Sequence, residues 1–269
     1  MSRPERGSKA QLAAIAQLLH QRGWVANHDG NVTARLGPDR FLATPTATSK
    51  AAVDDRSLLE VDGKGNRVAG SGRPFGEIGL HLAVYAARAD VGAVVHAHPP
   101  HATALACSGS GLLERPFIAE AVVSIGPSIP TVPFSLPGPG AAEALARFAA
   151  DHDAVLIASH GALAWGADLE QAYLRLELVE HLARIAILAQ AAGGLRYLPD
   201  EAIRPLLEAR AKANLGAAAD RAVEGGARPV VACAPAPHSA TPVISPGRPS
   251  GSEVAALVRE EILRALRER

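Results

Sequence analysis

The stretch Val91-Gly92-Ala93-Val94-Val95-His96-Ala97-His98 is a short apolar run that ends in two histidines. A run of this length and composition predicts a buried strand. In a strand, residues i and i+2 point to the same side. His96 and His98 are therefore expected to leave the strand end in one direction, as two ligands of a single cation must.

A third histidine, His160, ends a second apolar run over 154–158. Three neutral imidazoles that leave one position open are typical of a catalytic zinc-type site rather than a closed structural one. Glu77 opens a helix-like segment and is the candidate general base or additional ligand. Each residue alone has an ordinary explanation, since single histidines often pack beside strands and acids often begin helices. Their combination favours a metal site.

Composition excludes several classes of protein. Lys plus Arg and Asp plus Glu both total 27 among 269 residues, and no basic cluster or aromatic ladder suggests nucleic acid. Cys107 and Cys233 are far apart and offer no disulfide framework, which suits a reducing cytoplasm. We see neither a signal peptide nor an apolar stretch of about 18 residues for a membrane span. A cytoplasmic location is therefore expected.

Hydrophobic periodicity predicts an α/β domain over residues 1–215. Helical patterns cover residues 8–22, 77–88, 141–150 and 168–191. Strand patterns cover residues 32–36, 40–44, 58–61, 92–98, 129–134 and 154–158. Strands that alternate with helices indicate a layered α/β arrangement.

The composition changes toward the C-terminus. Residues 216–252 are rich in Pro, Ala and Gly and predict an extended linker. Residues 253–269 carry an apolar stripe at helical spacing, which predicts a short amphipathic helix. An isolated helix of this length is marginal in water, so we expect it to dock on a partner or to pack on its own domain or a sister subunit.

Two loops offer groups that could cradle an anion. Gly30-Asn31-Val32-Thr33 supplies turn amides and a side-chain amide, and the segment 44–50 supplies hydroxyls with Lys50 as an added charge. Both stretches are also generic turn chemistry, so each alone is weak evidence for a binding site.

Together these residues resemble the class II aldolase/adducin family, whose best-known enzyme is L-fuculose-phosphate aldolase. The matching stretches are Gly30-Asn31-Val32-Thr33, Thr44-Pro45-Thr46, Glu77-Ile78-Gly79-Leu80-His81-Leu82-Ala83-Val84-Tyr85, Val94-Val95-His96-Ala97-His98 and Ser159-His160-Gly161. The resemblance implies a three-layer αβα sandwich around a central, largely antiparallel β-sheet. It also implies a homotetramer with active sites at subunit interfaces.

The resemblance implies roles for particular residues. Zinc, or manganese or another divalent cation, would bind His96, His98 and His160, with Glu77 as the acid/base group. The anionic end of the substrate would lie at Gly30, Asn31 and Thr46, with Ala47 and Gly76 adjoining it.

Three departures from the family pattern bear on the substrate. Phe75-Gly76 replaces two small hydroxyl residues, Thr46-Ala47 replaces a Thr-Gly step, and the segment 117–126 holds no tyrosine for protonation. These replacements suit a smaller, less charged or aromatic acid better than a phosphorylated ketose. Related family members are decarboxylases of hydroxy-acids and of hydroxylated aromatic acids.

The leading hypothesis is a metal-dependent lyase that cleaves a hydroxy-carbonyl substrate by a retro-aldol step through an enediolate, releasing an aldehyde. The alternatives are a decarboxylase on the same site and a non-enzymatic, adducin-like interaction module. The linker and C-terminal helix resemble encapsulation peptides of bacterial microcompartments. That resemblance implies a shell or cargo partner in the microcompartment lumen and favours the aldolase.

Overall fold

The computed structural model describes residues 3–136 and 138–215, with side chains from residue 8 onward. All of these residues belong to the first of the two units into which the chain divides. The predicted linker over 216–252 and the predicted helix over 253–269 lie outside the described residues, so both remain predictions.

The described part is built on an eight-stranded sheet with the strand order β4-β3-β2-β1-β5-β8-β7-β6. Every neighbouring pair is antiparallel except β6 and β7, which are parallel, so the predicted largely antiparallel sheet is confirmed. The strands are β1 (Asn31–Gly37), β2 (Arg40–Ala43), β3 (Leu59–Val61), β4 (Arg67–Ala69), β5 (Ala93–Ala97), β6 (Thr131–Val132), β7 (Ala154–Ile157) and β8 (Gly161–Gly166).

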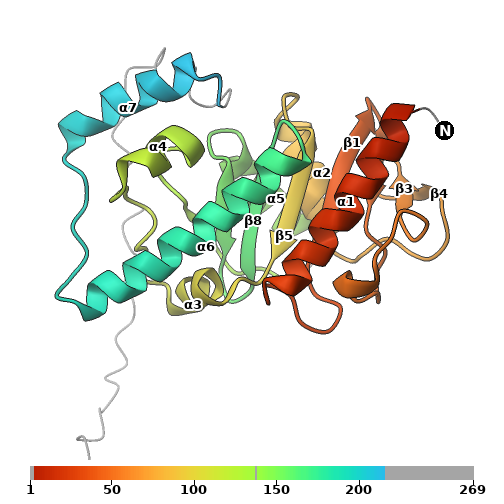
Figure 1. Cartoon of the computed structure of the whole chain (residues 1–269), viewed down its shortest axis with the longest axis horizontal. Coiled ribbons are helices and arrows are strands. Elements are labelled where there is room, and N and C mark those ends of the chain that lie inside the picture. Colours follow the sequence, from red (N-terminus) through yellow and green to blue (C-terminus); the bar gives the residue numbers. More distant parts are fainter. Residues whose placement is uncertain (1–2, 137, 216–269) are drawn as a thin grey trace, which may run out of the picture. The chain divides into compact units, whose positions relative to one another are not determined.

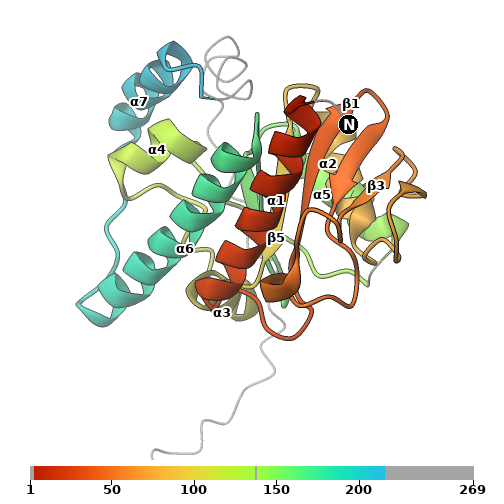
Figure 2. The same cartoon turned by 45° about the vertical axis from the view of Figure 1, so that its right-hand side comes forward.

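Helices cover both faces of the sheet (Figure 1). On one face lie α1, α3 and α6, and on the other lie α2 and α5, an arrangement that also holds in the turned view (Figure 2). Two further helices, α4 and α7, pack against each other, and α4 also contacts α6. The bounds of the helices and of one short 3-10 turn are α1 (Arg3–Gln21), η1 (Lys50–Ala52), α2 (Ile78–Ala87), α3 (Pro100–Ser108), α4 (Ala119–Ile125), α5 (Pro139–Ala149), α6 (Leu169–Ala191) and α7 (Asp200–Lys212). The predicted three-layer αβα sandwich is confirmed.

The apolar core is divided by the sheet into two clusters. In β5, Ala93, Val95 and Ala97 belong to the cluster under α1, α3 and α6, whereas Val94 belongs to the cluster under α2 and α5. His96 has the same strand parity as Val94 and so faces the α2 side. The strand that carries the predicted ligand is thus fixed in orientation by its apolar neighbours.

β5 lies at the centre of the sheet, between β1 and β8. His96 is paired with Asn31 of β1 on one side and with Leu163 of β8 on the other. β7 and β8 are joined by a turn that contains His160. The three segments that carry Asn31, His96 and His160 therefore meet at one end of the central strands.

The sequence patterns missed several elements, namely β4, β8, α3, α4 and α7. β6 is also shorter than predicted, at two residues rather than 129–134. β8 consists mostly of small residues and follows β7 after a three-residue turn, so no alternation or composition break marks its start. None of the described helices combines the length and hydropathy needed to cross a membrane.

Candidate metal centre

Three imidazoles converge at the end of β5, a central strand of the sheet. The Nε2 atom of His96 lies 3.2 Å from Nε2 of His98 and 3.1 Å from Nε2 of His160. A tetrahedral zinc with Zn–N bonds of about 2.0–2.1 Å holds its nitrogen ligands about 3.3 Å apart. The three residues predicted as ligands are thus brought together at spacings that fit one divalent cation.

Two glycines make this convergence sterically possible. A Cβ atom on Gly161 would lie 2.5 Å from Cδ2 of His98 and 2.6 Å from the Ala97 carbonyl oxygen. Gly30 has φ +70°, and a Cβ there would lie 3.0 Å from the His96 carbonyl oxygen. A larger residue at either position would push against the backbone or the ring that forms the site.

The Glu77 carboxylate lies beside the Nε2 atoms of the imidazoles, the side on which a cation would bind. It precedes the first residue of α2, and its Oε1 lies 2.6 Å from Nε2 of His160 while its Oε2 lies 3.6 Å from Nε2 of His96. The Asn31 side-chain amide donates to Oε2 at 3.0 Å. Glu77 is therefore placed where a further ligand or a proton carrier would be needed, and its role remains a prediction.

The charge states of these groups are coupled. Burial would raise the pKa of Glu77, but the hydrogen bond with His160 and the neighbouring His96 outweigh it and hold that pKa well below its usual range. Burial lowers the pKa of His96 to about 4 and also lowers the pKa of His98. The hydrogen bond to Glu77 raises the pKa of His160. His96 and His98 are therefore neutral at neutral pH, as metal binding requires.

The tautomer of His96 is fixed by its second ring nitrogen. Nδ1 lies 3.0 Å from the carbonyl oxygen of Ala162, which can only accept a hydrogen bond. Nδ1 must therefore carry the proton, which leaves the lone pair of Nε2 free for a cation. An oxygen that accepts a hydrogen bond from the outer ring nitrogen is a usual part of a histidine metal site.

A row of polar contacts connects β1 to α2 and holds the Glu77 side chain in place. Asn31, Thr33 and Arg35 alternate along one side of β1, and each meets a residue one helical turn further along α2. Asn31 contacts Glu77, Thr33 Oγ1 lies 2.8 Å from Nδ1 of His81 and 2.9 Å from the Tyr85 hydroxyl, and Arg35 donates to the Tyr85 carbonyl at 3.1 Å. The i, i+2, i+4 period of the strand thus matches the i, i+4, i+8 period of the helix.

Sequence reasoning missed Thr33 and His81 as individual residues of the site, although both lie in the stretches that carry the family resemblance. His81 is fully buried, and burial lowers its pKa to about 3. One signal for His81 was available, because it follows Glu77 by four residues and so lies on the same face of the helix.

The residues predicted to bind substrate lie on segments that adjoin the cluster. Thr46 donates its backbone N–H to the Arg73 carbonyl at 3.0 Å, and Pro45 forms an isolated bridge with Pro74. The loop with Thr46 and Ala47 therefore runs beside the segment that leads through Gly76 to Glu77. Contact of these three residues with a substrate remains a prediction.

Lys50, which the sequence predicted as an added charge for an anion, is occupied with backbone carbonyls. Its side chain is buried, and its Nζ donates to the carbonyls of His28 at 3.1 Å and Thr48 at 3.0 Å. Burial lowers the pKa of this amine, and the nearby Asp29 offsets only part of that shift. Lys50 thus connects the loop that contains His28 to its own loop through hydrogen bonds.

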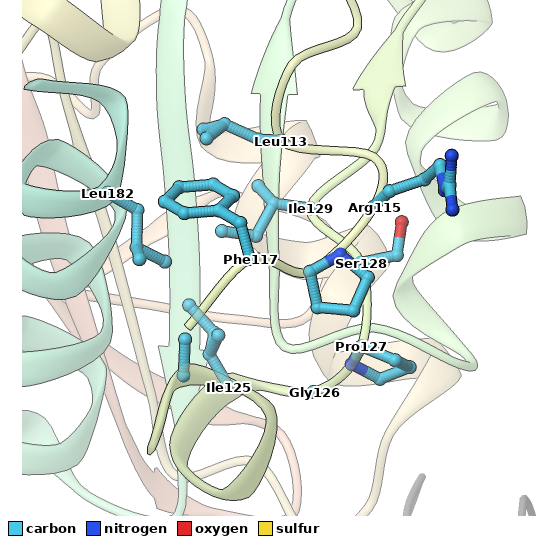
Figure 3. Close-up of a pocket in the computed structure, with 11 residues that line it drawn as sticks. Leu113, Arg115, Phe117, Ile125, Gly126, Pro127, Ser128, Ile129 and Leu182 are labelled. Carbon is cyan, nitrogen blue, oxygen red and sulfur yellow. The ribbon is translucent and has the colours of Figure 1, made fainter. Parts of the chain in front are cut away.

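A separate small cavity lies between α4 and α6 (Figure 3). It measures about 20 Å³ and is lined mainly by apolar side chains, among them Phe117, Ile129 and Leu182. This volume holds about one water molecule, so it does not suit a sugar-sized substrate. The segment 117–126, which lacks the tyrosine of the aldolases, contributes to this cavity.

Comparisons with known proteins agree with this geometry. Residues 10–187 match the model of the class II aldolase and adducin N-terminal domain. A 3-oxo-tetronate 4-phosphate decarboxylase of Escherichia coli O6:H1 is 33% identical over 198 residues, which make up 72% of this chain and 92% of that protein. A methylthioribulose-1-phosphate dehydratase of Sorangium cellulosum is 30% identical over 199 residues, covering 69% of this chain and 92% of that protein.

Among solved structures, the chain is similar to YgbL of Escherichia coli, described as a putative aldolase/epimerase/decarboxylase. The TM-score is 0.70 at 32% sequence identity, with 76% of this chain and 99% of that chain covered. The family match spans both histidine segments, Glu77 and all strands of the described sheet. The chain therefore belongs to the class II aldolase and adducin N-terminal domain family, and it is an enzyme of the class II aldolase superfamily.

Proposed function

We propose that this enzyme is a metal-dependent lyase that removes carbon dioxide from a 3-oxo acid of the sugar-acid type. The observation that carries the proposal is the convergence of three imidazoles with a single carboxylate, that of Glu77, on their ligand side. The curated relative at 33% identity, a decarboxylase of a phosphorylated 3-oxo acid, supports this choice of substrate class.

The residues present suit a divalent cation, with zinc as first choice and manganese as an alternative. Bound by His96, His98 and His160, it would supply a Lewis acid for the carbonyl next to the bond that breaks. Glu77 would hold the proton that the carbon accepts after carbon dioxide leaves. The hydrogen bond from Asn31 keeps the Glu77 carboxylate turned toward that position.

Decarboxylation is favoured over aldol cleavage by the number of proton carriers. A retro-aldol step needs a base at the hydroxyl and an acid at the new carbanion, whereas loss of carbon dioxide from a 3-oxo acid needs only the second. Within the described residues, Glu77 is the one carboxylate on the ligand side of the cluster, and the segment 117–126 supplies no tyrosine.

Aldol cleavage remains the second candidate. The solved relative YgbL is described with both aldolase and decarboxylase as options, so the same scaffold is compatible with either reaction. A hydroxy-carbonyl substrate such as L-fuculose 1-phosphate would then release an aldehyde rather than carbon dioxide. The two candidates share the cation and Glu77 and differ in the identity of the product.

We also propose a homotetramer, because superfamily members are often tetramers and the described surface exposes Phe134 and Leu136 to 65% and 76%. Light scattering should give a mass near four times the chain mass of 27.8 kDa. A mass of one chain would contradict this assembly.

The test uses protein loaded with zinc or manganese and measures carbon dioxide released from 3-oxo-tetronate 4-phosphate. Glu77→Gln should keep the metal but lower turnover by at least about 100-fold, the usual scale for loss of an acid/base group. His98→Ala should lose metal and activity together. Glu143→Gln, an exposed acid in α5, is the matched control and should leave both unchanged.

Each contrary outcome has a distinct meaning. Aldehyde release from L-fuculose 1-phosphate without carbon dioxide from the 3-oxo acid would select aldol cleavage. A fully active Glu77→Gln variant would contradict the role of Glu77. Failure of the wild-type protein to bind zinc or manganese would contradict a metal-dependent reaction.

A further inference from the structure

The second ring nitrogen of His98 faces a carboxylate that has no assigned role. His98 points its Nε2 toward the other two imidazoles, and its Nδ1 lies 3.6 Å from Oδ2 of Asp29. This separation is slightly longer than a hydrogen bond. Nδ1 of His98 can donate a hydrogen bond when it carries the proton, and the carboxylate oxygen of Asp29 can accept it. His96 has a corresponding partner in the Ala162 carbonyl, so two of the three imidazoles have an oxygen on the side away from the cation.

The turn that carries Asp29 is held in place without help from its side chain. The Asp29 backbone N–H donates to the Ala26 carbonyl at 2.9 Å, and Gly30 follows in the left-handed region at φ +70°. Within the described part of the chain, the Asp29 carboxylate makes no hydrogen bond to the backbone of this turn. Its position beside His98 is therefore not explained by the local turn.

The buried ammonium group of Lys50 holds the same turn in place. Lys50 is 2% exposed and donates to the carbonyl of His28, the residue before Asp29, and to the carbonyl of Thr48. These two acceptors are neutral, so the buried charge of Lys50 favours an acid close by. The charge of Asp29 acts on the Lys50 ammonium, whose pKa it raises, and the same carboxylate lies beside Nδ1 of His98.

We propose that Asp29 is a positioning residue of the metal centre, which accepts a hydrogen bond from Nδ1–H of His98 and so keeps the Nε2 lone pair directed at the cation. A neutral imidazole carries one N–H, and the acceptor beside one nitrogen decides which nitrogen can bind a metal. For His98 the accepting oxygen comes from a side chain, that of Asp29, whereas for His96 it comes from the backbone carbonyl of Ala162. The proposal rests on the proposed function, because it presumes that the imidazoles bind a cation.

The test measures the zinc dissociation constant of the purified full-length protein by competition with a chromophoric chelator. Asp29→Ala should bind zinc about 10–100-fold more weakly, the usual effect of removing such an outer partner. Asp29→Asn should lose less, because its amide oxygen can still accept from Nδ1–H. The matched control is Asp55→Asn, which removes the same charge from an exposed position and should bind zinc within about twofold of wild type.

A second pair of measurements separates positioning from folding. The melting temperature of the metal-free Asp29→Ala variant should fall by no more than about 2–4 °C, the shift that about 1 kcal/mol gives in a domain of this size. The turn keeps its backbone bonds and loses only the charge near Lys50. Lys50→Met should also weaken zinc binding, because the turn then loses the donor that holds the His28 carbonyl.

Zinc binding by Asp29→Ala within twofold of wild type would overturn the inference while leaving the proposed function intact. Failure of the wild-type protein to bind zinc or manganese would instead overturn both.

Discussion

His81 is a buried histidine that the fold keeps neutral. Burial lowers its pKa to about 3, whereas the unfolded chain takes up a proton near the ordinary value of 6.5. The stability that this residue contributes is therefore complete above pH 6.5 and is lost as the pH falls toward 3. In that window each such group lowers the free energy of unfolding by up to about 1.4 kcal/mol per pH unit.

We expect the metal-free wild type to lose stability between pH 6.5 and 4.5 more steeply than His81→Asn, whose amide does not titrate. Asn also keeps a polar atom near the position of Nδ1, so the contact with Thr33 can persist. Urea unfolding at several pH values measures the two slopes. Equal slopes would mean that His81 is protonated in the folded protein, contrary to its burial.

The turn between β7 and β8 depends on one glycine. A Cβ on Gly161 would lie 2.6 Å from the Ala97 carbonyl oxygen and 2.5 Å from the His98 ring, so Gly161→Ala must move the backbone of β5 or rotate a ligand. We expect this variant to lose about 1–3 kcal/mol of stability and to bind zinc more weakly. Urea unfolding and a zinc titration check the two effects.

Gly79 provides the control for Gly161. A Cβ on Gly79 meets nothing within 4 Å, and the residue lies inside α2. Gly79→Ala should therefore leave zinc binding unchanged and raise stability by about 0.5–1 kcal/mol through helix propensity. If Gly161→Ala behaved like Gly79→Ala, the close packing of the turn against His98 would be irrelevant to the site.

The sequence predicted best the elements whose apolar period is undisturbed. The run before His96 predicted β5, the run before His160 predicted β7, and spacing alone placed both histidines at strand ends. β8 escaped detection because its small residues owe their burial to neighbouring strands and to α6 rather than to an amphipathic pattern. α3 begins at Pro100, directly after Pro99, and two prolines read locally as an extended segment rather than a helix start.

Residues that meet across the sheet were less accessible to sequence reasoning. The ligand set could be predicted because i, i+2 spacing is local, but the contact between Asp29 and His98 joins turns that lie 69 positions apart in the chain. Lys50 shows the same limit, since nothing in its own loop reveals that its amine is buried against His28. Such contacts depend on the register of β1 against β5, which the two apolar patterns do not specify.

At the scale of the whole molecule, one aspartate joins the two helix layers. Asp153 immediately precedes β7, and its buried carboxylate contacts Arg88 at the end of α2 at 3.1 Å and Arg175 of α6 at 2.9 Å. It also pairs with Arg210 of α7, which in turn donates to the Val123 carbonyl of α4 at 2.9 Å. Elements from both faces of the sheet therefore share a single buried anion.

Removal of this anion should destabilise the entire described unit. Burial lowers the pKa of Arg175 to about 10 even with Asp153 beside it, which shows how strongly this site disfavours an uncompensated cation. Asp153→Asn keeps the size of the side chain but leaves three buried guanidinium groups without the shared charge. We expect a loss of about 3–5 kcal/mol in the free energy of unfolding, measured by urea denaturation.

Asp151→Asn is the control for this prediction, because Asp151 lies two residues away and is exposed. It should change stability by no more than about 0.5 kcal/mol, as surface substitutions usually do. Because the Asp153 carboxylate is fully buried, added salt should narrow the difference between the two variants very little. A loss below about 1 kcal/mol for Asp153→Asn would mean that the helix layers are held by apolar packing alone and that the arginines find other acceptors.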